Sequence, residues 1–235
     1  MNLSIEENQK YLDDGVLIVS NFLTLDEVRK FRKILDDYFL NHKSFSQGNH
    51  GKILSGFAGQ TPELEELNLF HHNKRLLRIL GSVIFTSSNF IFAEHSDLHQ
   101  NKSTGWHRDT KDYLCKERGN GDEQGLWSDD CHIIKACLLL QDHHSNDFGM
   151  SFKLGSHRAE CENPATFYAE TKSTDLIIFD QRILHAGQTA EKSYLQTHGA
   201  NRYLITYAYG LQNSHTLVHM KGAQIRQNEQ RAMFQ

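Results

Sequence analysis

A histidine and an aspartate two residues apart, His107 and Asp109, constrain the fold of this chain more than any other feature. A second histidine, His185, follows much later. Two imidazoles and one carboxylate can bind a ferrous ion on one side and leave about three of its six positions open. Because residues i and i+2 of a strand point to the same side, we expect His107 and Asp109 to point inward and Arg108 to point away. His185 completes this ligand set only in a fold that brings two strands together, as a small barrel does.

The residues around and after His185 strengthen this interpretation, since a His-x-Asp pair alone is a weak signal. An apolar segment, 175–180, precedes His185, and the small residues Ala186 and Gly187 leave room for a ligand. Arg202 then begins an alternating apolar segment. A ferrous ion with one carboxylate and two neutral histidines carries about one positive charge, so a dianionic co-substrate needs a further fixed cation, which Arg202 can supply. The alternatives are a core or capping role for His185 and a surface ion pair for Arg202.

Length and composition favour one domain, residues 1–235, and exclude several classes of function. The net charge of -4 disfavours binding to nucleic acid through a basic surface. The sequence has no run of about 18 apolar residues, so no membrane partner is expected. The acidic start lacks the order of a secretion signal, and the four cysteines have no CxxC spacing; both indicate a cytoplasmic protein with reduced thiols. A zinc hydrolase is the least favoured class, because no HExxH pair is present.

The first part of the chain, about residues 1–81, is predicted to be mainly helical. Ser4 with Glu7 and Thr24 with Glu27 have the capping-box spacing that begins a helix. The expected helices cover residues 4–13, 24–40 and 63–80, and residues 16–19 are expected to form a buried strand.

The second part, about residues 82–212, is predicted to be a β core. Short apolar segments separated by turn-rich ones favour a sandwich or a partly open barrel, with the helices packed outside it. A polar, glycine-containing segment, about 111–131, follows the His-x-Asp pair and is predicted to be a lid. The expected strands are residues 82–93, 132–141, 149–153, 175–179 and 203–209.

Four segments in the same order give the chain a family resemblance. Residues 11–23 read as an opening helix and strand, 105–109 as a first metal motif, and 149–158 as a strand that ends in a Gly-Ser-His turn. Residues 175–185, followed by Arg202, read as the final ligand and a co-substrate arginine. Together they resemble the phytanoyl-CoA dioxygenase family over nearly the whole chain.

The resemblance implies a double-stranded β-helix, a jelly-roll or cupin-like core that is mainly β with flanking helices. It also implies Fe(II) held by His107, Asp109 and His185, with 2-oxoglutarate bound by Arg202 and dioxygen as the second co-substrate. The expected reaction is hydroxylation of an unactivated C–H bond of a small-molecule metabolite or natural-product intermediate, with release of succinate and carbon dioxide. Desaturation, epoxidation and cyclisation use the same ligands, and a non-catalytic binding protein on the same fold is the alternative.

The sequence departs from the family pattern at three positions. Leu154 replaces a proline before the Gly-Ser-His turn, and residues 191–200 form an additional loop between His185 and Arg202. Gly187 stands where the family often has a hydroxyl that helps to hold 2-oxoglutarate.

Two further residues are predicted to contact 2-oxoglutarate. The hydroxyl of Thr206, or that of Thr189, would compensate for Gly187. The amide of Gln100, on the strand that leads to the metal motif, is the other candidate, against the alternative that it is an ordinary barrel-lining residue.

Overall fold

The computed structural model describes residues 4–42, 51–59, 61–81, 89–109, 127–128, 130–144, 149–158, 161–187 and 198–232. Its helices are α1 (Ile5–Asp14), α2 (Leu25–Asn41), η3 (Pro62–Leu64), α3 (Glu65–Asn68), η4 (Phe70–His72), α4 (Lys74–Ile79) and α7 (Ser214–Ala232). Its strands are β1 (Val16–Val19), β2 (Lys52–Ser55), β3 (Phe90–Gln100), β4 (Thr104–His107), β5 (Ile133–Leu139), β6 (Met150–Lys153), β7 (Thr166–Tyr168), β8 (Leu176–Asp180), β9 (His185–Gly187) and β10 (Tyr203–Leu211).

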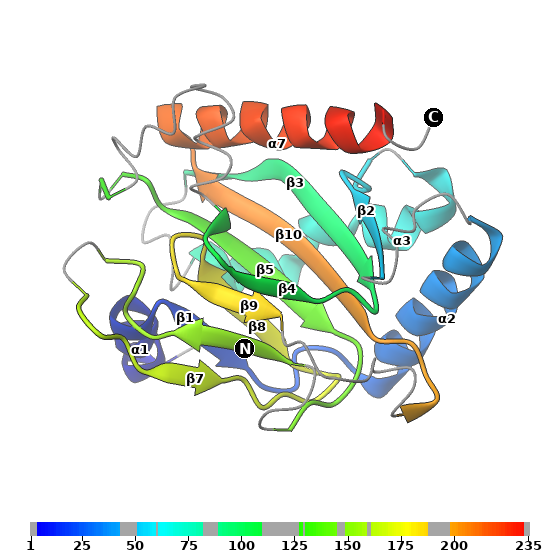
Figure 1. Cartoon of the computed structure of the whole chain (residues 1–235), viewed down its shortest axis with the longest axis horizontal. Coiled ribbons are helices and arrows are strands. Elements are labelled where there is room, and N and C mark those ends of the chain that lie inside the picture. Colours follow the sequence, from blue (N-terminus) through cyan, green and yellow to red (C-terminus); the bar gives the residue numbers. More distant parts are fainter. Residues whose placement is uncertain are drawn as a thin grey trace.

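The strands form two antiparallel sheets (Figure 1). The larger sheet has the order β1-β8-β5-β10-β3-β2, and the smaller one has the order β4-β9-β6-β7. From β3 onward the chain passes repeatedly from one sheet to the other, so that β3, β5, β8 and β10 lie in the larger sheet and β4, β6, β7 and β9 in the smaller. This alternation confirms the predicted jelly-roll core with flanking helices.

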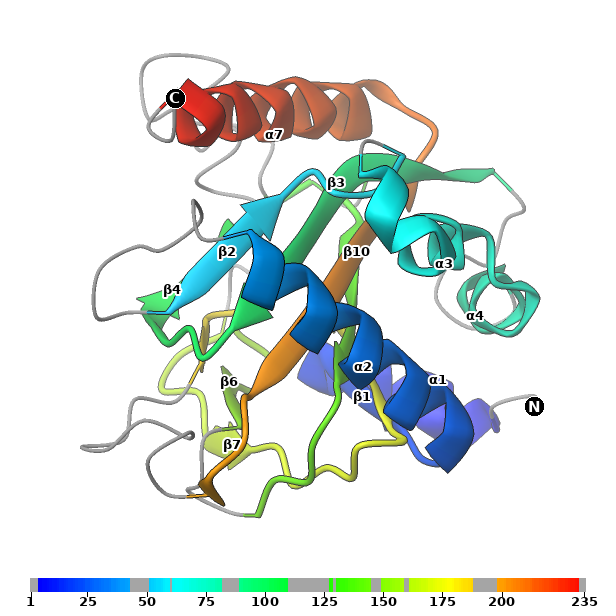
Figure 2. The same ribbon diagram turned by 90° about the vertical axis from the view of Figure 1, so that its right-hand side faces the viewer.

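Side-chain alternation along β10 divides the core between the two faces of the larger sheet. Tyr203, Ile205, Tyr207 and Tyr209 pack in the cluster that includes the buried residues of α2 and of the short helices after it. Leu204 belongs instead to a second cluster, which includes residues of β5, β6 and β8. Figure 2 shows α2, α3 and α4 on the side of the larger sheet that is remote from β6 and β7. The functional side chains therefore have to come from the inner face, between the sheets.

The capping boxes at Ser4 and Thr24 are confirmed. Each hydroxyl accepts a hydrogen bond from the backbone N–H of the glutamate three residues later, and each glutamate accepts one from the cap backbone. The strand predicted at 16–19 is β1, which pairs with β8 at the edge of the larger sheet. Local sequence is sufficient to place the starts of the two helices, because the capping contacts lie within one turn.

The helix predicted over 63–80 is wrong as a continuous element. It is divided into η3, α3, η4 and α4, and Asn73 begins the last of these because its side chain accepts hydrogen bonds from the N–H groups of Arg75 and Leu76. The leucine spacing is compatible with both arrangements, since short turns also bury Leu64, Leu67 and Leu76.

Several boundaries in the β region also differ from the predictions. The strand predicted at 82–93 is β3, which begins at Phe90 and extends to Gln100; residues 82–88 lie outside the described ranges. β2 and β7 were not predicted, and β2 places part of the N-terminal region in the larger sheet. Of the predicted lid, 111–131, only residues 127, 128, 130 and 131 are among those described.

A long C-terminal helix, α7, was not predicted either. Its buried residues Thr216, His219, Ala223 and Gln227 recur at helical spacing and face β3, along which α7 runs (Figure 1). Within the described ranges, every helix is too short or too polar to cross a membrane.

Candidate metal centre

His107, Asp109 and His185 meet where β4 pairs with β9. His107 is the last residue of β4 and lies opposite His185, the first residue of β9, with their ring centroids 4.3 Å apart. Asp109 lies two residues beyond the end of β4, so it reaches His107 from outside the strand. Arg108 points away, as expected, and donates to the backbone carbonyls of Arg182 and Ser156.

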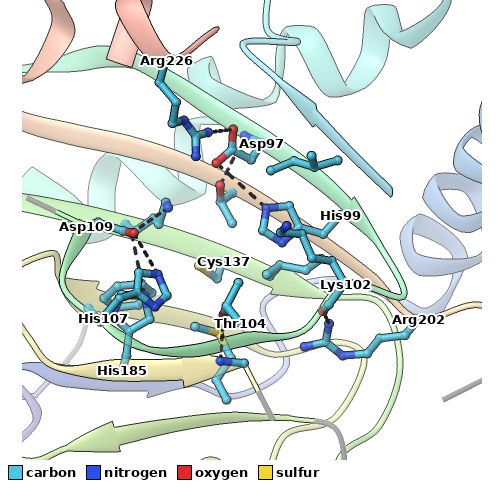
Figure 3. A pocket seen from close by; sticks show the side chains of 17 residues that line it. Asp97, His99, Lys102, Thr104, His107, Asp109, Cys137, His185, Arg202 and Arg226 are labelled. Carbon is cyan, nitrogen blue, oxygen red and sulfur yellow. Dashed lines mark hydrogen bonds and ion pairs between the residues drawn. The ribbon is translucent and has the colours of Figure 1, made fainter. Parts of the chain in front are cut away.

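The three side chains offer ligand atoms that all lie within 4.8 Å of one another. Nε2 of His107 is 3.2 Å from Oδ1 of Asp109, and Nε2 of His185 is 3.8 Å from Oδ2 (Figure 3). Nδ1 of His107 lies 2.7 Å from the carbonyl of Gly105, and Nδ1 of His185 lies 3.1 Å from that of Ile183. Since a carbonyl only accepts, each Nδ1 donates its proton to the backbone, which leaves Nε2 as the ring atom that a metal ion could use.

The electrostatics of the cluster also suit a divalent transition metal. Burial lowers the pKa of His185 to about 4, so this ring is neutral at pH 7. Burial also acts to lower the pKa of His107, but the hydrogen bond and charge of Asp109 outweigh it and the pKa is raised. Burial alone would raise the pKa of Asp109; the charges of Lys135 and the two histidines hold it well below its usual value. The donor set is thus one carboxylate and two imidazoles, which fits Fe(II).

The cluster opens into a pocket between the two sheets, and Arg202 lies at the other end of that pocket (Figure 3). Arg202 is only 4% exposed, and its Nη1 donates to the carbonyl of Lys102 at 2.9 Å. Thr206 lines the same pocket, and its hydroxyl accepts a hydrogen bond from the N–H of Asp97. The structure therefore brings five predicted residues together: the three candidate ligands, Arg202 and Thr206.

Gln100 is not brought into the pocket. It lies on β3 next to His99, and alternation turns its side chain to the opposite face, where it donates to the hydroxyl of Tyr203 at 3.0 Å. Asp97 and His99, two residues apart on the inner face, line the pocket instead. Strand alternation places Gln100 and His99 on opposite faces of β3. This alternation could not be used from the sequence, because the predicted strand ended at residue 93 and did not include either residue.

Four polar residues of the pocket were not singled out from the sequence: Asp97, Thr104, Lys135 and Arg226. Thr104 lies opposite Gly187 in the β4–β9 pair and accepts its N–H at 3.0 Å. Lys135 offered a signal, because it is a lone charge in the otherwise apolar strand β5. Arg226 offered none, because its place depends on where α7 packs.

Comparisons with known proteins give a fold and a distant relative. No family model matches the chain. Dioxygenase hkm4 from Aspergillus hancockii is 21% identical over 201 residues, which are 76% of this chain and 64% of that protein; the chain thus spans less than two thirds of its relative's length.

Solved structures are similar over nearly the whole chain. HygX from Streptomyces hygroscopicus, with nickel and 2-oxoglutarate bound, has a TM-score of 0.68 at 16% identity, covering 90% of this chain and 88% of HygX. The carbocyclase SnoK from nogalamycin biosynthesis has a TM-score of 0.63 at 17% identity, covering 91% and 89%. EctD from S. alaskensis, with 2-oxoglutarate and 5-hydroxyectoine bound, has a TM-score of 0.66 at 13% identity, covering 89% and 76%. The chain therefore has the jelly-roll fold found in these 2-oxoglutarate-binding enzymes.

Proposed function

We propose that this protein is an Fe(II)- and 2-oxoglutarate-dependent dioxygenase that oxidises an unactivated C–H bond of a small molecule. The observation that carries the proposal is the convergence of His107, Asp109 and His185 at one end of a pocket that has Arg202 at the other. The similarity to 2-oxoglutarate-binding structures and to a relative named as a dioxygenase supports it.

Each of these residues has a distinct part. His107, Asp109 and His185 would hold Fe(II), since their ligand atoms lie within 4.8 Å of one another and each ring directs Nδ1 to a backbone carbonyl, which leaves Nε2 for the metal. Arg202 would bind the far carboxylate of 2-oxoglutarate, because a buried guanidinium can make two charge-assisted hydrogen bonds to a carboxylate. Iron bound there would supply the oxidising chemistry, with 2-oxoglutarate and dioxygen as co-substrates and succinate and carbon dioxide as the co-products. The two sheets bury Asp109 and His185, which are 7% and 4% exposed, whereas the side chain of His107 is 31% exposed at the mouth of the site.

Hydroxylation of a metabolite or natural-product intermediate is the reaction we assign. Asp109 occupies the position that a halide would need on the metal, which disfavours halogenation. The solved structures include an epimerase and a carbocyclase of nogalamycin biosynthesis, so the same fold serves several outcomes in those proteins. The thiols of Cys137 and Cys161, which form no disulfide, fit a cytoplasmic location.

The test is succinate formation from 2-oxoglutarate by the purified protein with Fe(II), oxygen and a panel of small-molecule substrates. We expect succinate in stoichiometry with an oxidised product, and no succinate from His107→Ala. His72→Ala, which changes an exposed histidine outside the pocket, is the matched control and should retain full turnover. Unchanged turnover in His107→Ala would refute the assignment of the metal centre.

A separate binding measurement distinguishes an enzyme from a binding protein on the same fold. Mn(II) with 2-oxoglutarate should raise the melting temperature, because a ligand that binds only the folded state stabilises it. A shift without turnover on any substrate would favour the binding protein, and no shift would contradict both.

A further inference from the structure

Lys135 is a buried cation that contacts the metal centre without belonging to the ligand set. It lies on β5, where its side chain and that of Cys137 face the pocket, and it is only 6% exposed. Its Nζ is 2.7 Å from Oδ2 of Asp109. Long charged side chains are rarely buried unless they are paired, so a lysine here indicates a specific role for the contact.

The contact divides the two oxygens of Asp109 between different partners. Oδ1 faces Nε2 of His107 at 3.2 Å, while Oδ2 accepts from Lys135 at 2.7 Å and lies farther from Nε2 of His185, at 3.8 Å. A carboxylate with both oxygens available can chelate a metal ion and occupy two positions on it. With Oδ2 held by an ammonium, Asp109 supplies one oxygen only and leaves more positions for other ligands.

The same contact changes the charge that a metal ion meets. Asp109 and Lys135 form an ion pair, so the ammonium opposes the negative charge of the one carboxylate in the ligand set. The protein ligands therefore offer a divalent cation little net negative charge, and Lys135 repels it. A dianionic co-substrate in the same pocket supplies the missing negative charge, so that metal and co-substrate each favour the binding of the other.

We propose that Lys135 is a positioning residue that holds Asp109 as a one-oxygen ligand and makes retention of the metal depend on the co-substrate. This inference rests on the proposed function, because it assumes that a divalent metal and 2-oxoglutarate share the pocket. It predicts weak binding of metal alone, tight binding with 2-oxoglutarate, and loss of that difference when the charge of Lys135 is removed.

The test measures the dissociation constant of Mn(II) by calorimetry, with and without saturating 2-oxoglutarate. In the wild type we expect 2-oxoglutarate to tighten Mn(II) binding about 10- to 100-fold, within the usual range of coupling between sites. Lys135→Gln keeps a hydrogen-bond donor but removes the charge. This variant should bind Mn(II) alone about tenfold more tightly than the wild type. The tightening of Mn(II) binding by 2-oxoglutarate should then be about tenfold smaller than in the wild type.

Two further variants show whether charge, rather than a change in the fold, is responsible. Lys135→Arg keeps the charge and should retain the wild-type coupling. Lys153→Gln, on β6 and outside the pocket, is the matched control and should leave both constants unchanged. A melting curve of each variant establishes that it is folded before titration.

The outcomes separate this inference from the proposed function. If the wild type binds both Mn(II) and 2-oxoglutarate but Lys135→Gln leaves their coupling unchanged, or weakens Mn(II) binding, the role of Lys135 is overturned and the metal centre stands. Equal loss of coupling in Lys135→Arg and Lys135→Gln would also overturn it. If the wild type binds neither, the proposed function itself fails.

Discussion

Replacing Arg226 by methionine should destabilise the protein, because Arg226 joins α7 to the larger sheet. Its Nη2 donates to Oδ1 of Asp97 on β3 and to the hydroxyl of Ser55 on β2. The side chain of Asp97 is 2% exposed and that of Arg226 is 22% exposed. Burial alone would raise the pKa of Asp97, but Arg226 and His95 hold it well below its usual value, so the carboxylate is charged and needs its partner.

The magnitude follows from removing the arginine charge beside Asp97, which leaves the carboxylate with the neutral ring of His95, 3.1 Å from Oδ2. Removing one partner of a buried ion pair costs about 3–5 kcal/mol, and the partial exposure of Arg226 places the loss near the lower end, at about 3 kcal/mol. For a chain of this length each kcal/mol lowers the melting temperature by about 2–4 °C, so Arg226→Met should melt about 6–12 °C lower.

The assay is urea and thermal unfolding of Arg226→Met, Asp97→Asn and the double variant. The double variant should be more stable than the sum of the two single losses predicts, by about 1 kcal/mol or more, because it leaves no buried charge without a partner. Arg29→Met is the matched control: Arg29 pairs with Asp26 on the surface, with side chains 71% and 87% exposed, and its loss should be within about 0.5 kcal/mol. A loss below about 1 kcal/mol in Arg226→Met would show that the pair is effectively solvated and refute the reasoning.

Two other predictions concern the pocket and its surroundings. Arg202→Met should weaken 2-oxoglutarate binding about 100-fold or more, because two charge-assisted hydrogen bonds of about 1.5–3 kcal/mol each are lost. The dissociation constant of Mn(II) measured without 2-oxoglutarate should stay near the wild-type value. An unchanged affinity for 2-oxoglutarate would exclude Arg202 as the residue that binds its far carboxylate. Lowering the pH should destabilise the fold before most carboxylates become protonated, because His95 is held neutral in the folded protein. Burial, with a further contribution from the charge of Lys135, lowers the pKa of His95 from 6.5 to about 4. The unfolded chain then binds more protons between these values, so the free energy of unfolding falls as pH drops from about 6.5 to about 4, by about 3 kcal/mol from this residue. The free energy of unfolding, measured with urea across this pH range, should fall less steeply in His95→Gln than in the wild type. An identical fall in both proteins would contradict the lowered pKa of His95.

Much of the candidate site could be predicted because its signals are local. The His107-x-Asp109 spacing, the apolar segment before His185 and the alternating segment after Arg202 can each be seen in a few consecutive residues. Asp109 lies beside His107, with Oδ1 3.2 Å from Nε2, but it lies beyond the end of β4, whereas the prediction from strand alternation placed it within the strand.

What the sequence alone determined is set by short-range chemistry: the capping boxes, the apolar strands and the residue types that can bind a metal. The jelly-roll core was expected from the family resemblance, whereas the strand pattern by itself favoured a sandwich or a partly open barrel. Only the tertiary structure decided which face of β3 Gln100 occupies, that Asn73 divides a long helical pattern, and that Lys135 reaches Asp109 across 26 residues of chain. These depend on strand register and on packing between distant segments, and a shift of one residue in register turns every side chain of a strand to the other face.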